Sequence, residues 1–140
     1  DVLVGSGFYE IYADGFYSRQ VPERLGQTPD SALFAHVETV NSLDNSFSLL
    51  KNNCLAQAVQ PVADNRNVKA QDVRLYEWTR TFHPDPSAAN GVCRERDVLY
   101  GVCSGKERPE AWEAGGRNAD VFFLKGVIEQ VTKSLDLPLE

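Results

Sequence analysis

Hydrophobic and polar residues alternate most regularly between Val73 and Phe82, and this period predicts a β-strand. A carboxylate on the same face as Val73 and Leu75 is costly to desolvate unless a cation or backbone donors meet it, so Glu77 is expected to have a fixed partner. The opposite face suits an anionic group, because two arginines bracket two aromatic rings. A well-paired central strand explains the same pattern and is the favoured interpretation. That second face would carry Arg74, Tyr76, Trp78, Arg80 and Phe82.

The N-terminal residues predict short elements joined by a long connection. Val2–Ser6 favours a helix that Gly7 would end, since glycine adopts the left-handed conformation without steric cost. Alternation over Phe8–Phe16 predicts a strand with one face in the core. Residues 18–31 contain proline and glycine among polar side chains, so they are expected to form a connection with room for one short helical turn.

The middle of the chain predicts a strand, a turn and a helix. Phe34–Val40 favours a strand, and Asn41–Ser46 is rich in side chains that favour a turn and a helix N-cap. Pro61 either kinks the following helix or opens a second one, because proline removes a backbone hydrogen bond. The residues at helical spacing are Leu50, Cys54, Leu55, Ala58, Val59 and Val62.

The C-terminal half predicts a hairpin and a final helix. Residues 83–91 read as a loop, and Arg96–Ser104 alternates as a second strand, which together predict an antiparallel hairpin with a wide tip. Pro109–Ala114 favours a short helix that would place Trp112 against the sheet. Asp120 is a suitable N-cap for the last helix. The apolar stripe of that helix would contain Phe123, Leu124, Val127, Ile128, Val131 and Leu135.

Composition predicts a single domain over residues 1–140, because 42% hydrophobic residues suffice for a core of ordinary size. The formal charge of −6 argues against a broad nucleic-acid-binding surface, which needs clustered Lys and Arg. The sequence has neither an apolar run long enough to span a bilayer nor a signal peptide, so no membrane partner is expected. Because the chain begins at Asp1 without an initiator methionine, it reads as an excised piece.

The cysteines and histidines favour packing roles over metal binding. Cys54, Cys93 and Cys103 form no C-x-x-C pair, and two histidines add little to a plausible zinc site, so buried or half-buried thiols in a reducing cytoplasm are expected. His36 and His83 are expected to form hydrogen bonds near strand ends. Neither type of residue predicts a metal site or a catalytic group.

Five segments in the same order carry a resemblance to a known family. One segment is Arg74-Leu75-Tyr76-Glu77 with Arg80 and Phe82. The others are Leu3–Glu10, Val40–Asn53, Arg96–Gly105 and Asp120–Glu129. Together they resemble the β subunit of bacterial phenylalanyl-tRNA synthetase, in which the helix that matches Asp120–Glu129 begins similarly with D-F-F-D-L-K-G. Their shared order across nearly the whole chain argues against coincidence.

The resemblance implies a class II aminoacyl-tRNA synthetase-like core, an α/β (α+β) fold with a mainly antiparallel sheet flanked by helices, here possibly truncated. In this family the core of the β subunit is a non-catalytic scaffold within a cytoplasmic heterotetramer. Its implied partner is the α subunit, which activates phenylalanine with ATP and Mg²⁺. The family's editing site and tRNA(Phe)-binding modules lie elsewhere in the β chain. The fragment is therefore expected to be inactive alone and to hold no cofactor.

A few residues remain as candidates for chemistry or binding. Arg80, Arg94 and Arg96 are the alternative cofactor-binding residues, although the Arg94–Arg96 run more often forms a solvated rim. Phe122 and Phe123 are candidate subunit contacts, because one of two adjacent aromatics on a helix is left facing outward. Two rival hypotheses stay open: a free-standing amino-acid- or nucleotide-binding module derived from a class II synthetase, and a protein-interaction domain.

Overall fold

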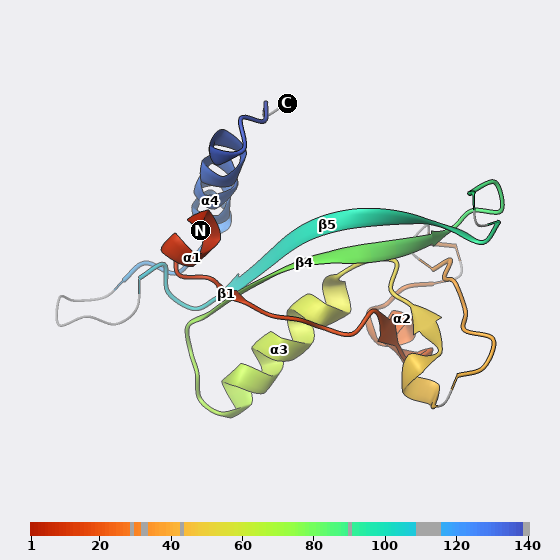
Figure 1. Cartoon of the computed structure of the whole chain (residues 1–140). Helices are drawn as coiled ribbons and strands as arrows, with labels where there is room; N and C mark the ends of the chain where they lie inside the picture. Colours follow the sequence, from red (N-terminus) through yellow and green to blue (C-terminus); the bar gives the residue numbers. More distant parts are fainter. Residues whose placement is uncertain (29, 32–33, 43, 90, 109–115, 139–140) are drawn as a thin grey trace. The chain divides into compact units, whose positions relative to one another are not determined.

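The computed structural model describes residues 1–28, 30–31, 34–42, 44–89, 91–108 and 116–138 (Figure 1). The chain divides into two compact units. Unit 1 consists of Asp1–Ile11, Val59–Tyr76 and Gly101–Glu140, and unit 2 consists of Tyr12–Ala58 and Glu77–Tyr100. The predicted short helix at Pro109–Ala114, with Trp112, lies outside the described residues.

A three-stranded sheet is built around the strand that the alternation predicted, and its order is β1-β4-β5. Strand β4 (Val73–Pro84) and strand β5 (Cys93–Ser104) are the two long neighbouring ribbons of Figure 1. The loop between them is too short for a parallel crossover, so they form the predicted antiparallel hairpin. Strand β1 (Tyr9–Glu10) is parallel to β4, with Tyr9 opposite Leu75.

The prediction of a mainly antiparallel sheet is therefore wrong, because the observed sheet is mixed. The physical reason is the order of the strands. Strand β1 pairs with β4 across the long crossover that includes helix α3 (Leu55–Asn67), and a connection of this kind permits parallel pairing. The α/β class itself is confirmed.

The two faces of β4 differ in burial. Val73, Leu75, Glu77 and Thr81 are buried on one face, whereas Trp78 on the other is exposed. Because successive side chains point to opposite sides of a strand, the burial follows directly from the sequence period.

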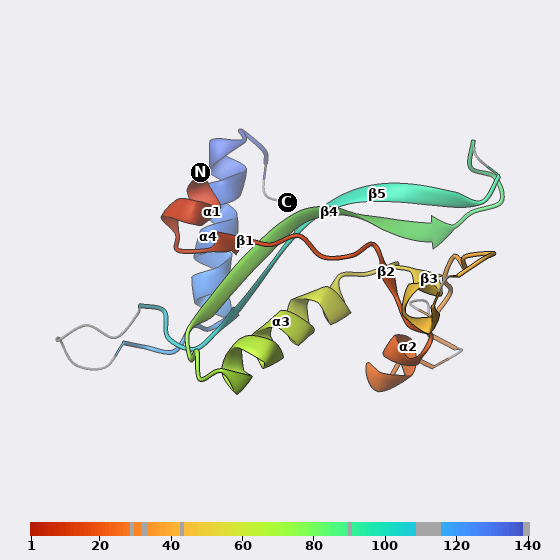
Figure 2. The same ribbon diagram turned by 60° about the horizontal axis from the view of Figure 1, so that its bottom comes forward.

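Unit 1 packs two helices against each other next to this sheet. Helix α1 (Val2–Gly5) lies beside helix α4 (Val121–Ser134) in both views (Figures 1 and 2). The chain turns after α1 at Gly7, whose φ of +82° confirms the predicted need for glycine. The Asp120 side chain accepts hydrogen bonds from the backbone N–H groups of Phe122 and Phe123, which confirms the predicted N-cap.

Unit 2 contains a second, two-stranded sheet with short helices. Strand β2 (Phe16–Tyr17) pairs antiparallel with β3 (Leu49–Leu50). Helix α2 (Gln20–Arg24) is the short helix allowed for in the connection, and Asp44 caps the 3-10 helix η1 (Asn45–Phe47). Tyr17, Val37 and Leu49 are buried here together with several polar side chains.

The prediction of one continuous strand over Phe8–Phe16 is wrong. Only the short strands β1 and β2 form, one near each end of that range. Phe8 is buried and Tyr9 is 75% exposed. Within unit 1, the Ile11 N–H still donates to the Tyr76 carbonyl at 2.9 Å. Within unit 2, the Ala13 N–H donates to Glu77 Oε1, so a side chain takes the place of a backbone acceptor and the ladder does not continue.

The predicted strand at Phe34–Val40 is also wrong among its described residues. Glu38 forms only an isolated bridge with Leu49. The Thr39 hydroxyl donates to the Phe47 carbonyl at 2.8 Å, and His36 Nδ1 lies 2.5 Å from the Phe34 carbonyl oxygen. Side chains that bond to nearby backbone compete with a regular ladder.

Helix α3 begins later than predicted and passes through Pro61. Leu50 belongs to β3, and the Asn53 side chain accepts from the Leu55 N–H at 3.0 Å at the start of the helix. The apolar residues at helical spacing do not form the expected buried stripe, because Leu55 and Val59 are about half exposed while Gln57 is buried. Pro61 removes one intrahelical hydrogen bond without ending the helix.

Candidate functional site

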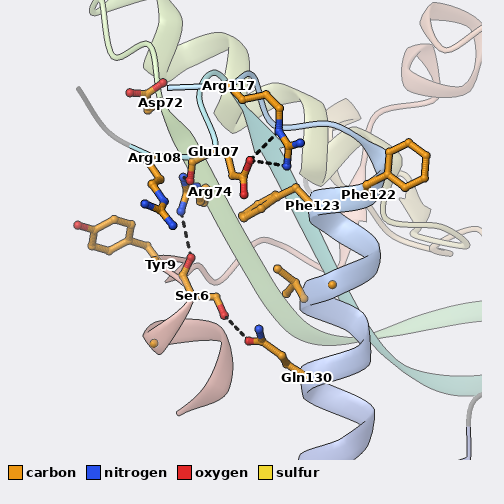
Figure 3. Close-up of a pocket in the computed structure, with 14 residues that line it drawn as sticks. Ser6, Tyr9, Asp72, Arg74, Glu107, Arg108, Arg117, Phe122, Phe123 and Gln130 are labelled. Atoms are coloured by element: carbon orange, nitrogen blue, oxygen red, sulfur yellow. Dashed lines mark hydrogen bonds and ion pairs between the residues drawn. The ribbon is translucent and has the colours of Figure 1, made fainter. Parts of the chain in front are cut away.

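A pocket of about 800 Å³ in unit 1 is the candidate functional site (Figure 3). Three separate parts of the sequence build it: the end of α1 with the start of β1, the start of β4, and α4 with the segment that leads into it. Its lining residues are Gly5, Ser6, Gly7, Tyr9, Asp72, Arg74, Glu107, Arg108, Arg117, Phe122, Phe123, Gly126, Val127 and Gln130.

Arg74 holds the parts of the pocket together. Its guanidinium donates to the carbonyl of Ser6 at 3.1 Å, to that of Lys106 at 2.9 Å, and to that of Glu107. These carbonyls follow α1 and β5, so one side chain of β4 connects both segments. The guanidinium also lies 5.0 Å from the centroid of the Phe123 ring, in a cation–π contact. Arg74 is therefore a structural cation whose donors are largely occupied.

The two adjacent phenylalanines at the start of α4 have different environments. The Phe123 ring is half-buried and stacks on Phe8, with centroids 6.4 Å apart and planes within 5°. The Phe122 side chain is 74% exposed at the pocket rim. Asp120 fixes this arrangement by accepting from both backbone N–H groups at 2.9 Å. One ring thus faces inward and the other outward, and their role as subunit contacts stays a prediction.

The charges of the pocket are only partly compensated within it. Arg117 Nη2 lies 2.9 Å from Glu107 Oε2, and Arg117 Nε donates to the same oxygen at 3.0 Å. Arg108, which is exposed, has no ion-pair partner among the described residues. Asp72 accepts from the backbone N–H of Lys106 at 2.7 Å. An exposed guanidinium in a pocket lined by aromatic rings can bind a carboxylate or an aromatic group from a partner.

The pocket is suited to binding more than to bond making. Ser6 is its only hydroxyl apart from the Tyr9 phenol among the lining residues. The Ser6 hydroxyl donates to the Val2 carbonyl at 2.9 Å and lies 3.4 Å from Gln130 Oε1, with no histidine beside it to act as a base.

The three arginines that the sequence offered as alternative cofactor-binding residues belong to unit 2 and do not line this pocket. Arg80 Nη1 lies 2.9 Å from Glu95 Oε2, and Arg80 Nε lies 3.0 Å from Asp97 Oδ1. These hydrogen bonds, that to Asp97 first, raise the pKa of the Arg80 guanidinium further above its ordinary value. Arg94 and Arg96 are exposed.

Glu77 has the fixed partners that its place in the sequence predicted. Its Oε1 accepts from the Ala13 N–H at 2.9 Å, and its Oε2 lies 3.8 Å from Lys51 Nζ. The side chains of both Lys51 and Glu77 are almost fully buried. The identity of the cation was not apparent from the sequence, because Lys51 lies outside any alternating or helical pattern.

The thiols and imidazoles have the structural environments expected of them. Cys93 is buried, Cys54 and Cys103 are half-buried, and burial raises the pKa of the latter two thiols. His36 Nε2 lies 2.5 Å from the Tyr17 hydroxyl, and His83 Nε2 lies 3.0 Å from Thr81 Oγ1. The predictions of buried or half-buried thiols and of hydrogen-bonded histidines are confirmed. Among the described residues, no helix has the length and apolar character that crossing a bilayer requires.

Fold and site together define a small α/β protein of two compact units, with a pocket of arginines and aromatic rings in unit 1. A family model for the phenylalanyl tRNA synthetase beta chain CLM domain matches residues 1–140, and the chain belongs to this family. The resemblance recognised in the sequence is thereby confirmed.

Individual relatives agree with the family match. The chain is 30% identical to the phenylalanine–tRNA ligase beta subunit of Salinibacter ruber over 142 residues, covering 98% of this chain and 17% of the relative. It is 26% identical to that of Geobacter sulfurreducens, covering 94% of this chain and 16% of the relative. The beta subunit of Mannheimia succiniciproducens is 30% identical, with 92% and 16% covered. The chain thus spans about a sixth of the length of these relatives, which belong to an enzyme.

Proposed function

We propose that this chain is a non-catalytic structural domain of a phenylalanyl-tRNA synthetase β subunit. In this proposal it supports the ATP-dependent attachment of phenylalanine to tRNA(Phe) by an α/β assembly of the class II type. The whole enzyme would be a cytoplasmic heterotetramer that uses ATP and Mg²⁺, with catalysis in the α subunit and tRNA contacts in other parts of the β chain. The family match to the β chain is the observation that carries this proposal.

The pocket of unit 1 supports a scaffold role, and in this proposal the α subunit docks there. Phe122 and Arg108 are both exposed and line the same pocket from different sides, so they offer an aromatic anchor and a cation to one partner (Figure 3). Truncating a central aromatic anchor commonly costs a complex a large part of its affinity. Arg74 and Phe123 would keep that surface in shape without contacting the partner.

Co-purification with a phenylalanyl-tRNA synthetase α subunit tests the docking surface. The Phe122→Asp substitution should reduce the amount of α subunit recovered at least several-fold, because it puts a charge where a ring would be buried. Phe47→Asp is the matched control, since Phe47 is another partly exposed phenylalanine and belongs to unit 2. Equal recovery with both variants would reject the pocket as the docking surface.

Isothermal titration of the chain with ATP and with phenylalanine tests the proposal that the chain is non-catalytic. We expect no saturable heat with either ligand. The alternative of a free-standing nucleotide- or amino-acid-binding module relies on Arg80 or the Arg94–Arg96 run, and Arg80 is already held by two carboxylates. Saturable binding that Arg80→Ala or Arg96→Ala abolishes would favour that alternative and overturn the scaffold assignment.

A further inference from the structure

The interior of unit 2 contains a lysine and a glutamate that the docking proposal does not use. The exposed fraction of each residue is 1%. The backbone holds Lys51 in place on both sides: its N–H donates to the Gly15 carbonyl at 2.9 Å, and its carbonyl accepts from the Phe82 N–H at 2.8 Å. Glu77 is held on the buried face of β4 by its bond from the Ala13 N–H.

Three polar atoms in this interior lack a hydrogen-bond partner within the described structure: Lys51 Nζ, Glu77 Oε2 and the Tyr100 hydroxyl. The 3.8 Å between Lys51 Nζ and Glu77 Oε2 allows an ion pair but is too long for a hydrogen bond. Burial first, and then the proximity of Glu77, raise the pKa of Tyr100, yet the Tyr100 hydroxyl has no well-aligned hydrogen bond to that carboxylate. Buried donors and acceptors without partners are rare, because each forfeits its bonds to water.

The three atoms complement one another in donors and acceptors. An ammonium group offers protons, a carboxylate oxygen offers lone pairs, and a phenol offers both. Two atoms 3.8 Å apart can each lie about 2.8 Å from a single oxygen placed beside them. A buried water usually makes about three hydrogen bonds to groups that would otherwise be unsatisfied. Other titratable groups lie nearby: Arg80 and Asp97 line a pocket with Lys51. The half-buried Cys54 thiol has a pKa that is raised mainly by burial and is also affected by Lys51 and Glu77.

We propose that unit 2 has an internal water-binding site that holds one ordered water. This water accepts a hydrogen bond from Lys51 Nζ, donates one to Glu77 Oε2, and forms a third with the Tyr100 hydroxyl. The water completes the ion pair and makes it part of a satisfied polar network. Such a network fixes the strand β4 to the Gly15 and Lys51 segments within this unit.

A smaller pocket of about 320 Å³ gives this water a route to solvent. Its lining includes Lys51, Ala13 and Gly15, and its rim includes the exposed Tyr12 and Trp78. All of these residues belong to unit 2. The water can therefore exchange with bulk solvent without unfolding of the unit.

A crystal structure of the unmodified chain, at a resolution that shows ordered solvent, tests the site directly. We expect one peak within about 2.6–3.2 Å of Lys51 Nζ, Glu77 Oε2 and the Tyr100 hydroxyl. The absence of density there, with Lys51 Nζ and the Tyr100 hydroxyl bonded directly to Glu77, would overturn the proposal. In solution, the Lys51 ammonium protons should show a cross-relaxation signal with a bound water, and no such signal would also overturn it.

A matched pair of tyrosine variants tests whether the Tyr100 hydroxyl helps to hold the water. Tyr100→Phe removes one of the three partners, so the solvent peak should lose occupancy and the Lys51–water signal should weaken at least two-fold. Tyr76→Phe deletes an exposed hydroxyl that lies 3.4 Å from Glu10 Oε2, and it should leave both readouts unchanged. An undiminished peak and signal in Tyr100→Phe would reject the three-partner site.

Discussion

At the scale of single residues, Lys51 and Glu77 depend on each other because neither charge reaches solvent. Lys51→Met keeps much of the side-chain volume and leaves a buried carboxylate without its cation, although the hydrogen bond from the Ala13 N–H remains. Breaking a buried pair by removing one partner typically costs about 3–5 kcal/mol. We therefore expect Lys51→Met to lower the free energy of unfolding by about 3 kcal/mol, measured by urea denaturation.

The double variant Lys51→Met/Glu77→Leu is the control for this prediction. Replacing both charges with apolar groups removes the isolated carboxylate, so the double variant should be more stable than Lys51→Met alone. Independent, additive losses from the two substitutions would contradict the coupling. In that case the 3.8 Å pair would contribute little to the stability of unit 2.

His83 is the residue whose charge should link stability to pH. Burial, followed by the positive charges of Arg96 and Arg94, holds its pKa below the ordinary value of 6.5. Because the folded state binds this proton less readily than the unfolded state, protonation of His83 opposes folding. The free energy of unfolding should therefore be unaffected by His83 above the ordinary pKa, and should decrease as pH falls from that value through the lower folded-state pKa. NMR titration should give His83 a midpoint below 6.5, and Arg96→Ala should raise that midpoint. A midpoint at or above 6.5 would contradict the prediction.

At the scale of elements, the N-terminus of α4 depends on a single side chain. Asp120 accepts from the N–H groups of Phe122 and Phe123, both at 2.9 Å. Asp120→Ala should lower the free energy of unfolding by about 1 kcal/mol, because these two donors lose their acceptor. Asp120→Asn, which keeps a capping oxygen, is the control and should lose less. Equal losses in urea denaturation would show that charge, and not the cap, matters at this position.

Elements with a strong local period could be predicted from the sequence more reliably than those whose pairing depends on distant residues. Strand β4 and helix α4 have apolar positions at spacings that only one kind of element explains. The alternation at Phe8–Phe16 has the same form, but the Glu77 carboxylate takes the Ala13 N–H and the ladder stops. Long-range competition of this kind leaves no local signal. Pro61 shows the converse, since α3 continues past a residue that locally favours a break.

The candidate site was predictable only in part for a similar reason. Phe122 and Phe123 were recognisable because they adjoin on one amphipathic helix. The role of Arg74 was not, because the carbonyls that it binds belong to Ser6, Lys106 and Glu107, all distant from it in sequence. Arg80 stood out as an anion-binding candidate, yet its partners Glu95 and Asp97 come from the neighbouring strand β5. Which charges are neutralised is decided by strand pairing.

At the scale of the whole molecule, charge sets the expected behaviour toward tRNA. The formal charge of −6 repels phosphate, although Arg66, Lys69 and Lys106 gather around a single carboxylate, Asp72, in one pocket of unit 1. Binding through phosphates needs many such contacts, and each is weakened by salt. At about 0.15 M ionic strength we expect the chain to leave the mobility of tRNA(Phe) in a gel unchanged. A salt-sensitive shift that disappears in Lys69→Glu, but persists in the surface control Lys125→Glu, would show that the local cluster outweighs the overall charge.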